Sequence, residues 1–161
     1  MLKLRDRHED VTRLPAEPTR ARPVLLATLS VRVDPSAERM AIDSALEAGV
    51  PLIIANLLPL RPYPTTFVLL GPEGMTLPHE EDLDAVRSTA ARAGKLGVQT
   101  ELLRVTTRHP VRALLELVRE RDAGLLVFGP DLSRTGRWRF RTVAWRVRKQ
   151  ADCLVWVAPD G

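Results

Sequence analysis

The sequence predicts a single α/β domain with a doubly wound parallel sheet, in which five strands alternate with four helices. Short apolar runs of strand length alternate with longer segments whose apolar residues recur at helical spacing. Proline or glycine stands at most boundaries between these segments. The length of 161 residues is enough for one domain with one sizeable core, and no internal repeat interrupts the alternation.

Residues 1–22 are expected to form a flexible extension, because charges and isolated apolar residues follow one another there without a period. The domain is expected over 23–161. Its first segment, VLLATL at 24–29, is a continuous apolar run, which is typical of a strand buried on both faces.

The first helix is predicted over 35–48. Asp34 supplies a capping carboxylate and Pro35 fits the first helical position. Small apolar residues recur at helical spacing as far as Ala48, which places that residue on the buried face, and Gly49 ends the helix.

A second buried strand is predicted over 52–58. The next 20 residues, 59–78, carry five prolines and two glycines and are expected to form a long loop. A helix follows over 80–95, with acidic residues at its positive N-terminal end. Leu96 is expected to extend its buried side.

The rest of the chain completes the alternation. A strand is expected over 98–105, and Pro110 opens the next helix. The run 125–129 predicts the fourth strand, a helix extends to about Lys149, and 153–157 predicts the last strand. In such sheets ligands bind beyond the carboxyl ends of the strands, where the strand order reverses.

Composition limits the location and the class of protein. The chain has 45% hydrophobic and 27% charged residues, and its longest apolar stretch, near 51–60, is too short to cross a bilayer. Residues 1–9 are charged, unlike a signal peptide. Cys153, the single cysteine, argues for a reducing compartment. We therefore expect a cytoplasmic protein with no membrane contact.

Two stretches of the chain resemble the universal stress protein family. The segment PVRALLELVRERDAGLLVFG at 110–129 is similar to that family's third helix and fourth strand, and CLVWVAP at 153–159 to its terminal strand. The resemblance covers 23–159 and implies a flavodoxin-like, adenine-nucleotide α-hydrolase-like sheet of order 3-2-1-4-5. It also implies a homodimer, often made by pairing the last strand, with this interface: Cys153, Leu154, Val155, Trp156 and Val157.

The ATP-binding pattern that the resemblance implies is degenerate here. Leu29 stands where binders carry an aspartate, and Leu132 and Arg141 stand where they carry glycines. Glycines let backbone N–H groups approach phosphates, so their loss argues against ATP in the usual pose. The residues that would contact a ligand, if one binds, are Thr28, Leu29, Leu57, Gly129, Arg134, Arg137, Arg141 and Thr142.

An arginine-rich segment, 133–142, occupies the place of the phosphate loop and leaves three alternatives open. Its guanidinium groups suit a nucleotide or another phosphorylated anion. Its interleaved Trp138 and Phe140 suit weak nucleic-acid contact. Its aromatic residues could instead pack on the domain while the arginines pair with carboxylates such as Asp131. Because the segment matches no known nucleic-acid-binding fold, we expect nucleic acid least of the three.

Val143 and Val147 are expected to face the core, which turns Trp145 outward as a candidate contact for a protein partner. No histidine or cysteine spacing suits a metal, and no nucleophile motif is present. Asp34, Asp43 and Asp131 suit caps or surface charge. We therefore expect no catalytic residue, no metal and no firm cofactor, and predict a non-catalytic signalling or interaction module in the stress response. The alternative is a sensor of a phosphorylated anion such as ATP.

Overall fold

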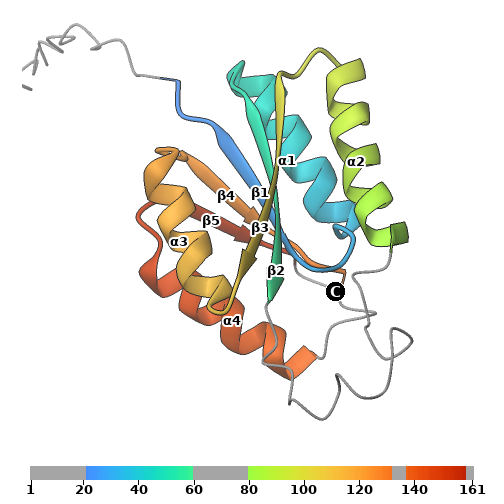
Figure 1. The fold of residues 1–161 in the computed structure, drawn as a ribbon. Helices are drawn as coiled ribbons and strands as arrows, with labels where there is room; N and C mark the ends of the chain where they lie inside the picture. Colours follow the sequence, from blue (N-terminus) through green and yellow to red (C-terminus); the bar gives the residue numbers. More distant parts are fainter. Residues whose placement is uncertain (1–20, 60–79, 132–136, 159–161) are drawn as a thin grey trace, which may run out of the picture.

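The computed structural model describes residues 21–59, 80–131 and 137–158, which Figure 1 draws as ribbons. The elements follow one another as β1 (Val24–Leu29), α1 (Pro35–Ala48), β2 (Leu52–Pro59), α2 (Glu80–Lys95), β3 (Thr100–Thr107), α3 (Pro110–Glu120), β4 (Leu125–Phe128), α4 (Arg137–Gln150) and β5 (Leu154–Val157). All neighbouring strands pair in parallel, in the order β3-β2-β1-β4-β5. The predicted class and strand order are confirmed.

The start and end of α1 follow the sequence signals. Asp34 accepts a hydrogen bond from the backbone N–H of Ser36 at 2.8 Å, and Gly49 ends the helix with φ of 62°, a conformation that glycine adopts without strain. The expected burial of Ala48 is wrong. It is exposed because it lies in the last turn, beyond the reach of the sheet.

Two further details differ from the prediction. Leu96 is 58% exposed, because α2 ends at Lys95 and helical periodicity no longer positions the residue after it. The third strand begins at Thr100 instead of residue 98, since the N–H of Val98 closes the end of α2 by donating to Ala93 O at 3.1 Å. The predicted loop 59–78 lies outside the described residues, apart from Pro59.

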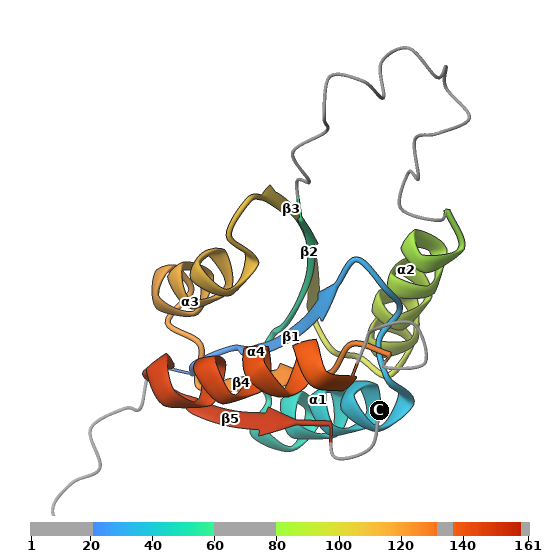
Figure 2. The same ribbon diagram turned by 90° about the horizontal axis from the view of Figure 1, so that it is seen from below.

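Two layers of helices cover the sheet (Figures 1 and 2). Helices α1 and α2 pack on one face, where Leu26, Ile54 and Val127 project from the strands. Helices α3 and α4 pack on the other face, over Leu25, Ile53 and other strand residues. The apolar runs of β1 and β2 are therefore continuous, because both faces of these central strands are buried.

Candidate functional site

The reversal of strand order lies between β1 and β4, which are neighbours in the sheet although the chain between them builds β2 and β3. Register pairs Ala27 of β1 with Ala55 of β2 and with Phe128 of β4, so the carboxyl ends of these strands lie together. Ligands of doubly wound sheets bind beyond such ends. The crevice between β1 and β4 is therefore the candidate site.

Backbone hydrogen bonds join the loop after β1 to the segment after β4. Val33 and Pro130 form an isolated antiparallel bridge. On either side of it, the N–H of Asp34 donates to Gly129 O at 2.9 Å and the N–H of Asp131 donates to Arg32 O at 3.0 Å. We call this arrangement the crevice bridge. It ties the loop after β1 to the segment after β4 through the chain's own polar groups, at the carboxyl end of the β1–β4 crevice.

An ion pair reinforces the crevice bridge. Arg32 Nε lies 2.5 Å from Asp131 Oδ2, and the carboxylate side chain is only 14% exposed. The N–H of Arg32 also donates to Asp82 Oδ1 of α2 at 3.3 Å, and Asp82 is buried. Asp131 thus pairs with an arginine of the loop after β1. Its expected pairing with the arginine-rich segment stays a prediction, because most of that segment's side chains lie outside the described residues.

The polar groups at the end of β1 are satisfied locally. Thr28 is buried, and its hydroxyl donates to Val31 O at 2.6 Å. Ser30 has φ of 57° and uses its N–H to reach Leu57 O at 3.0 Å and Asn56 Oδ1 at 3.2 Å. Its hydroxyl also donates to Leu57 O, at 3.3 Å. The carbonyl of Leu57, one of the residues expected to contact a ligand, is therefore already engaged by Ser30.

One buried polar group at this end of the sheet has no partner. The side-chain nitrogen of Asn56 is buried and makes no hydrogen bond among the described residues. Asn56 borders a cavity of about 160 Å³ under α2, together with Leu83, Arg104 and other residues of α2 and β3. A buried amide without a partner is costly, and a water molecule held in this cavity would satisfy it.

Gly129, the expected first glycine of a phosphate loop, has a packing role in this structure. A Cβ atom at this position would lie 2.2 Å from Ala37 Cβ of α1, far inside van der Waals contact. Its carbonyl accepts from Asp34 and its N–H donates to Ala27 O at 3.2 Å. The close approach of α1 to the end of β4 therefore requires glycine here.

The predicted anion-binding residues are only partly described. Arg134 lies outside the described residues, and Arg137 begins α4 without a described side chain. Arg141 and Thr142 are exposed on α4, and Arg141 makes no ion pair with any described residue. Leu29 is half-buried and packs on the core beneath α3 and α4. The structure brings Thr28, Leu29, Leu57 and Gly129 to the crevice, but the arginine set is not assembled there by the described residues.

The edge of the sheet presents apolar side chains. Strand β5 pairs with β4 on one side, and Leu154 is 75% exposed. Cys153, Val155 and Trp156 are half-buried, whereas Val157 is buried. Burial raises the pKa of the Cys153 thiol above its ordinary value, and the backbone hydrogen bond from Leu126 opposes this shift.

The residues that sequence reasoning missed are Ser30, Arg32 and Asn56. Asn56 was detectable, because it is a polar residue within an otherwise apolar strand and is paired in register with the equally polar Thr28.

Within the described ranges, no helix is long and apolar enough to cross a membrane. The same ranges hold no cluster of three or more His, Cys, Asp or Glu side chains that could bind a metal ion.

Comparisons with known proteins agree with this fold. A family model described as "Universal stress protein family" matches residues 21–159. A universal stress protein from Archaeoglobus fulgidus is 23% identical, with a TM-score of 0.61, over 84% of this chain and 97% of that one. A universal stress protein from Archaeoglobus fulgidus in complex with dAMP gives a TM-score of 0.54 at 23% identity, over 84% of this chain and 96% of that one.

A universal stress protein solved in complex with cAMP is 25% identical to this chain. Its TM-score is 0.59, and the match covers 88% of this chain and all of that one. A search of curated proteins found no significant match.

Proposed function

The chain belongs to the universal stress protein family, and on that premise we propose that it is a non-catalytic signalling or protein-interaction module of the stress response. It acts as a cytoplasmic homodimer and does not bind ATP in the family's usual pose. The single, partly buried cysteine supports a reducing compartment.

The crevice bridge is the observation that carries this proposal. A ligand that enters between β1 and β4 competes with two backbone hydrogen bonds, each of which contributes about 0.5–1.5 kcal/mol, and with the Arg32–Asp131 pair. Leu29, which stands where binders carry an aspartate, has no carboxylate that could form a hydrogen bond with the ligand. One missing charged hydrogen bond costs about 1.5–3 kcal/mol, or about tenfold to a hundredfold in affinity.

The β5 edge supports the interaction role. An edge strand exposes N–H and C=O groups that a second strand can pair with, and a large apolar side chain beside them favours burial. Leu154 provides this side chain, and Trp156 lies on the same face of the strand. A homodimer formed through β5 would bury both.

A second candidate function is a sensor of a phosphorylated anion. Arg141 is exposed on α4 and makes no ion pair with the described residues, it is adjacent in sequence to the exposed Thr142, and a guanidinium suits a phosphate group. Two of the similar structures contain dAMP and cAMP, which gives this alternative specific test ligands.

Calorimetric titration and thermal shift with ATP, ADP, dAMP and cAMP test the proposal. We expect no saturable heat and no saturable rise in Tm with any of the four nucleotides. Saturable binding of ATP would overturn the main proposal. Binding that is lost in Arg141→Ala, but kept in the matched surface variant Arg39→Ala, would establish the sensor instead.

A further inference from the structure

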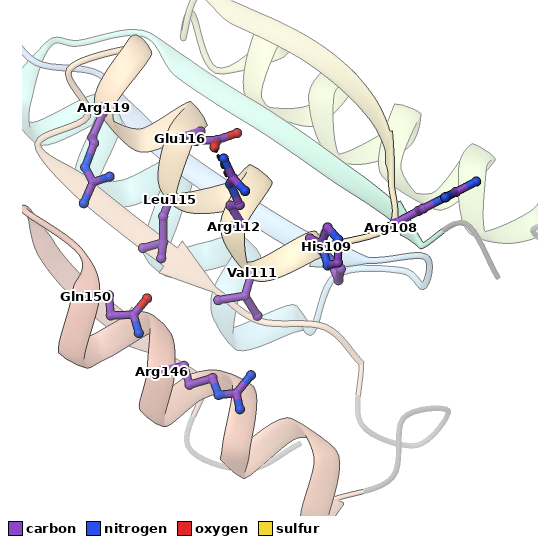
Figure 3. Close-up of a pocket in the computed structure, with 10 residues that line it drawn as sticks. Arg108, His109, Val111, Arg112, Leu115, Glu116, Arg119, Arg146 and Gln150 are labelled. Atoms are coloured by element: carbon purple, nitrogen blue, oxygen red, sulfur yellow. Dashed lines mark hydrogen bonds and ion pairs between the residues drawn. The ribbon is translucent and has the colours of Figure 1, made fainter. Parts of the chain in front are cut away.

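A groove of about 790 Å³ lies between α3 and α4, away from the crevice bridge (Figure 3). Val111 and Leu115 project from α3 toward α4, whereas Arg146 and Gln150 project from α4 toward α3. None of the residues of the crevice bridge lines it. The groove therefore forms a second candidate site that is independent of the proposed function.

The groove is rich in cations. Arg112 pairs with Glu116 at 2.8 Å, and Arg119 pairs with Asp152 at 2.8 Å. Arg108 and Arg146 also line it and make no ion pair with any residue that the structure describes. Four positive guanidinium groups are thus balanced by only two carboxylates, so the groove keeps a net positive charge.

The shape of the groove favours an extended ligand. Helix α3 has 11 residues, which corresponds to about 16 Å of length at the α-helical rise. The arginines are spread along it, from Arg108 before its first turn to Arg119 near its last. A ligand with one compact charge could reach only part of this set, whereas a chain with repeated negative charges could reach most of it.

Helix α4, which forms one wall of the groove, distinguishes between kinds of polyanion by its exposed side. The helix carries six Arg and Lys residues and no carboxylate. Trp145 is 60% exposed, and Lys149 Nζ lies 5.0 Å from the centre of its ring. An exposed indole next to cations offers a stacking surface for a nucleobase, which an acidic peptide cannot use in that way.

We propose that the α3–α4 groove binds single-stranded nucleic acid. The phosphates lie along the arginines of the groove, and a base that reaches over α4 stacks on the exposed Trp145. Guanidinium groups bind phosphate oxygens in bidentate fashion, which suits this arrangement. Nucleic acid was the least expected ligand of the segment 133–142, because that segment matches no known nucleic-acid-binding fold. The groove between α3 and α4 is a different surface, and only the fold brings its arginines together.

Fluorescence anisotropy with a labelled oligo(U) strand tests the proposal, over about 50–200 mM salt. We expect binding whose affinity falls with salt. Removing two phosphate contacts should make the slope of log K against log salt shallower by about 1.4, at about 0.7 for each contact. The double variant Arg108→Ala with Arg146→Ala removes these two contacts. It is chosen because neither change leaves a carboxylate without its ion-pair partner. Trp145→Ala should weaken binding at least about fivefold.

A matched double variant separates the groove from overall charge. Arg39 and Arg104 are exposed and make no ion pair among the described residues, and they belong to α1 and β3. Arg39→Ala with Arg104→Ala removes the same charge and should keep the wild-type slope. Melting curves show whether each variant folds.

Three results would overturn the proposal. The first is no binding of the oligonucleotide at the lowest salt. The second is an equal loss of affinity in the matched double variant, which would indicate attraction by net charge alone. The third is full competition by polyglutamate of equal charge together with an unchanged affinity of Trp145→Ala, which would point to an acidic protein partner.

Discussion

Arg32 and Asp131, 99 residues apart in the sequence, form an ion pair of 2.5 Å across the mouth of the β1–β4 crevice. The same two residues are joined through their backbone, since the N–H of Asp131 donates to Arg32 O. The segment after β4, at the switch point where ligands of doubly wound sheets bind, is thereby tied to the loop after β1.

Replacing Arg32 with alanine should loosen the crevice bridge while costing little global stability. The Arg32 side chain is about half exposed, so water screens the pair, whereas the Asp131 carboxylate is only 14% exposed. The loss should therefore cost about 1 kcal/mol, the upper end of the range for exposed pairs. Hydrogen exchange should show faster exchange of the Asp34 and Asp131 amides, because these amides form the bridge.

Arg22→Ala is the control for this experiment. It removes an ion pair with Asp122, at 2.8 Å, near the opposite ends of the strands. It should leave exchange at Asp34 and Asp131 unchanged. Equal exchange of both amides in wild type and Arg32→Ala would contradict a stabilising role for the ion pair.

Gly129→Ala should destabilise the protein by about 1–3 kcal/mol, the usual cost of overpacking a filled site. The new Cβ would lie 2.2 Å from Ala37 Cβ, so α1 must shift. A domain of this size would lose about 2–4 °C of Tm for each kcal/mol. Thermal unfolding measures the effect.

Ala37→Gly provides the matching test of the cause. It removes the atom that the new methyl group would meet, at a cost of about 1 kcal/mol for glycine in a helix. The double variant should therefore be more stable than Gly129→Ala alone, which a double-mutant cycle quantifies. Strictly additive losses would show that the contact with Ala37 is not the reason for glycine.

The fold could be predicted because its signals are local. The apolar run 24–29, the cap at Asp34 and the glycine at 49 each specify a strand or a helix end through a few neighbouring residues. The errors at Ala48 and Leu96 both lie at helix ends, where helical periodicity no longer determines which side faces the sheet.

The candidate site could be predicted only in part. The topology alone places Leu29 and Gly129 at the β1–β4 crevice, so the resemblance was enough to nominate them. Closure of the crevice depends on Arg32 meeting Asp131, and no local pattern encodes contacts between residues so distant in the chain. For the same reason, the sequence did not show that Gly129 packs against α1.

Cys153 should react slowly with thiol reagents in the folded protein. Burial raises the pKa of its thiol, and only the thiolate is the nucleophile. The neutral thiol contributes to stability at every pH below the thiol's pKa in the unfolded chain. This contribution is lost as the pH rises through the thiol's higher pKa in the folded protein. The pH midpoint of iodoacetamide alkylation should therefore be higher in the folded protein than in the urea-unfolded chain. A lower midpoint would contradict this prediction.

Leu154→Glu should shift the proposed homodimer toward the monomer. The side chain is 75% exposed on the edge strand β5, so the change costs the isolated chain little. In a dimer paired through β5, the new carboxylates would lie near the seam, where burial of unpaired charge is unfavourable. Sedimentation equilibrium measures the change in the dimerisation constant.

Leu96→Glu alters an equally apolar, 58% exposed residue beyond the end of α2 and should leave the dimer intact. If both variants dimerise like the wild type, β5 is not the interface, whereas equal weakening by both would indicate a general effect of added negative charge.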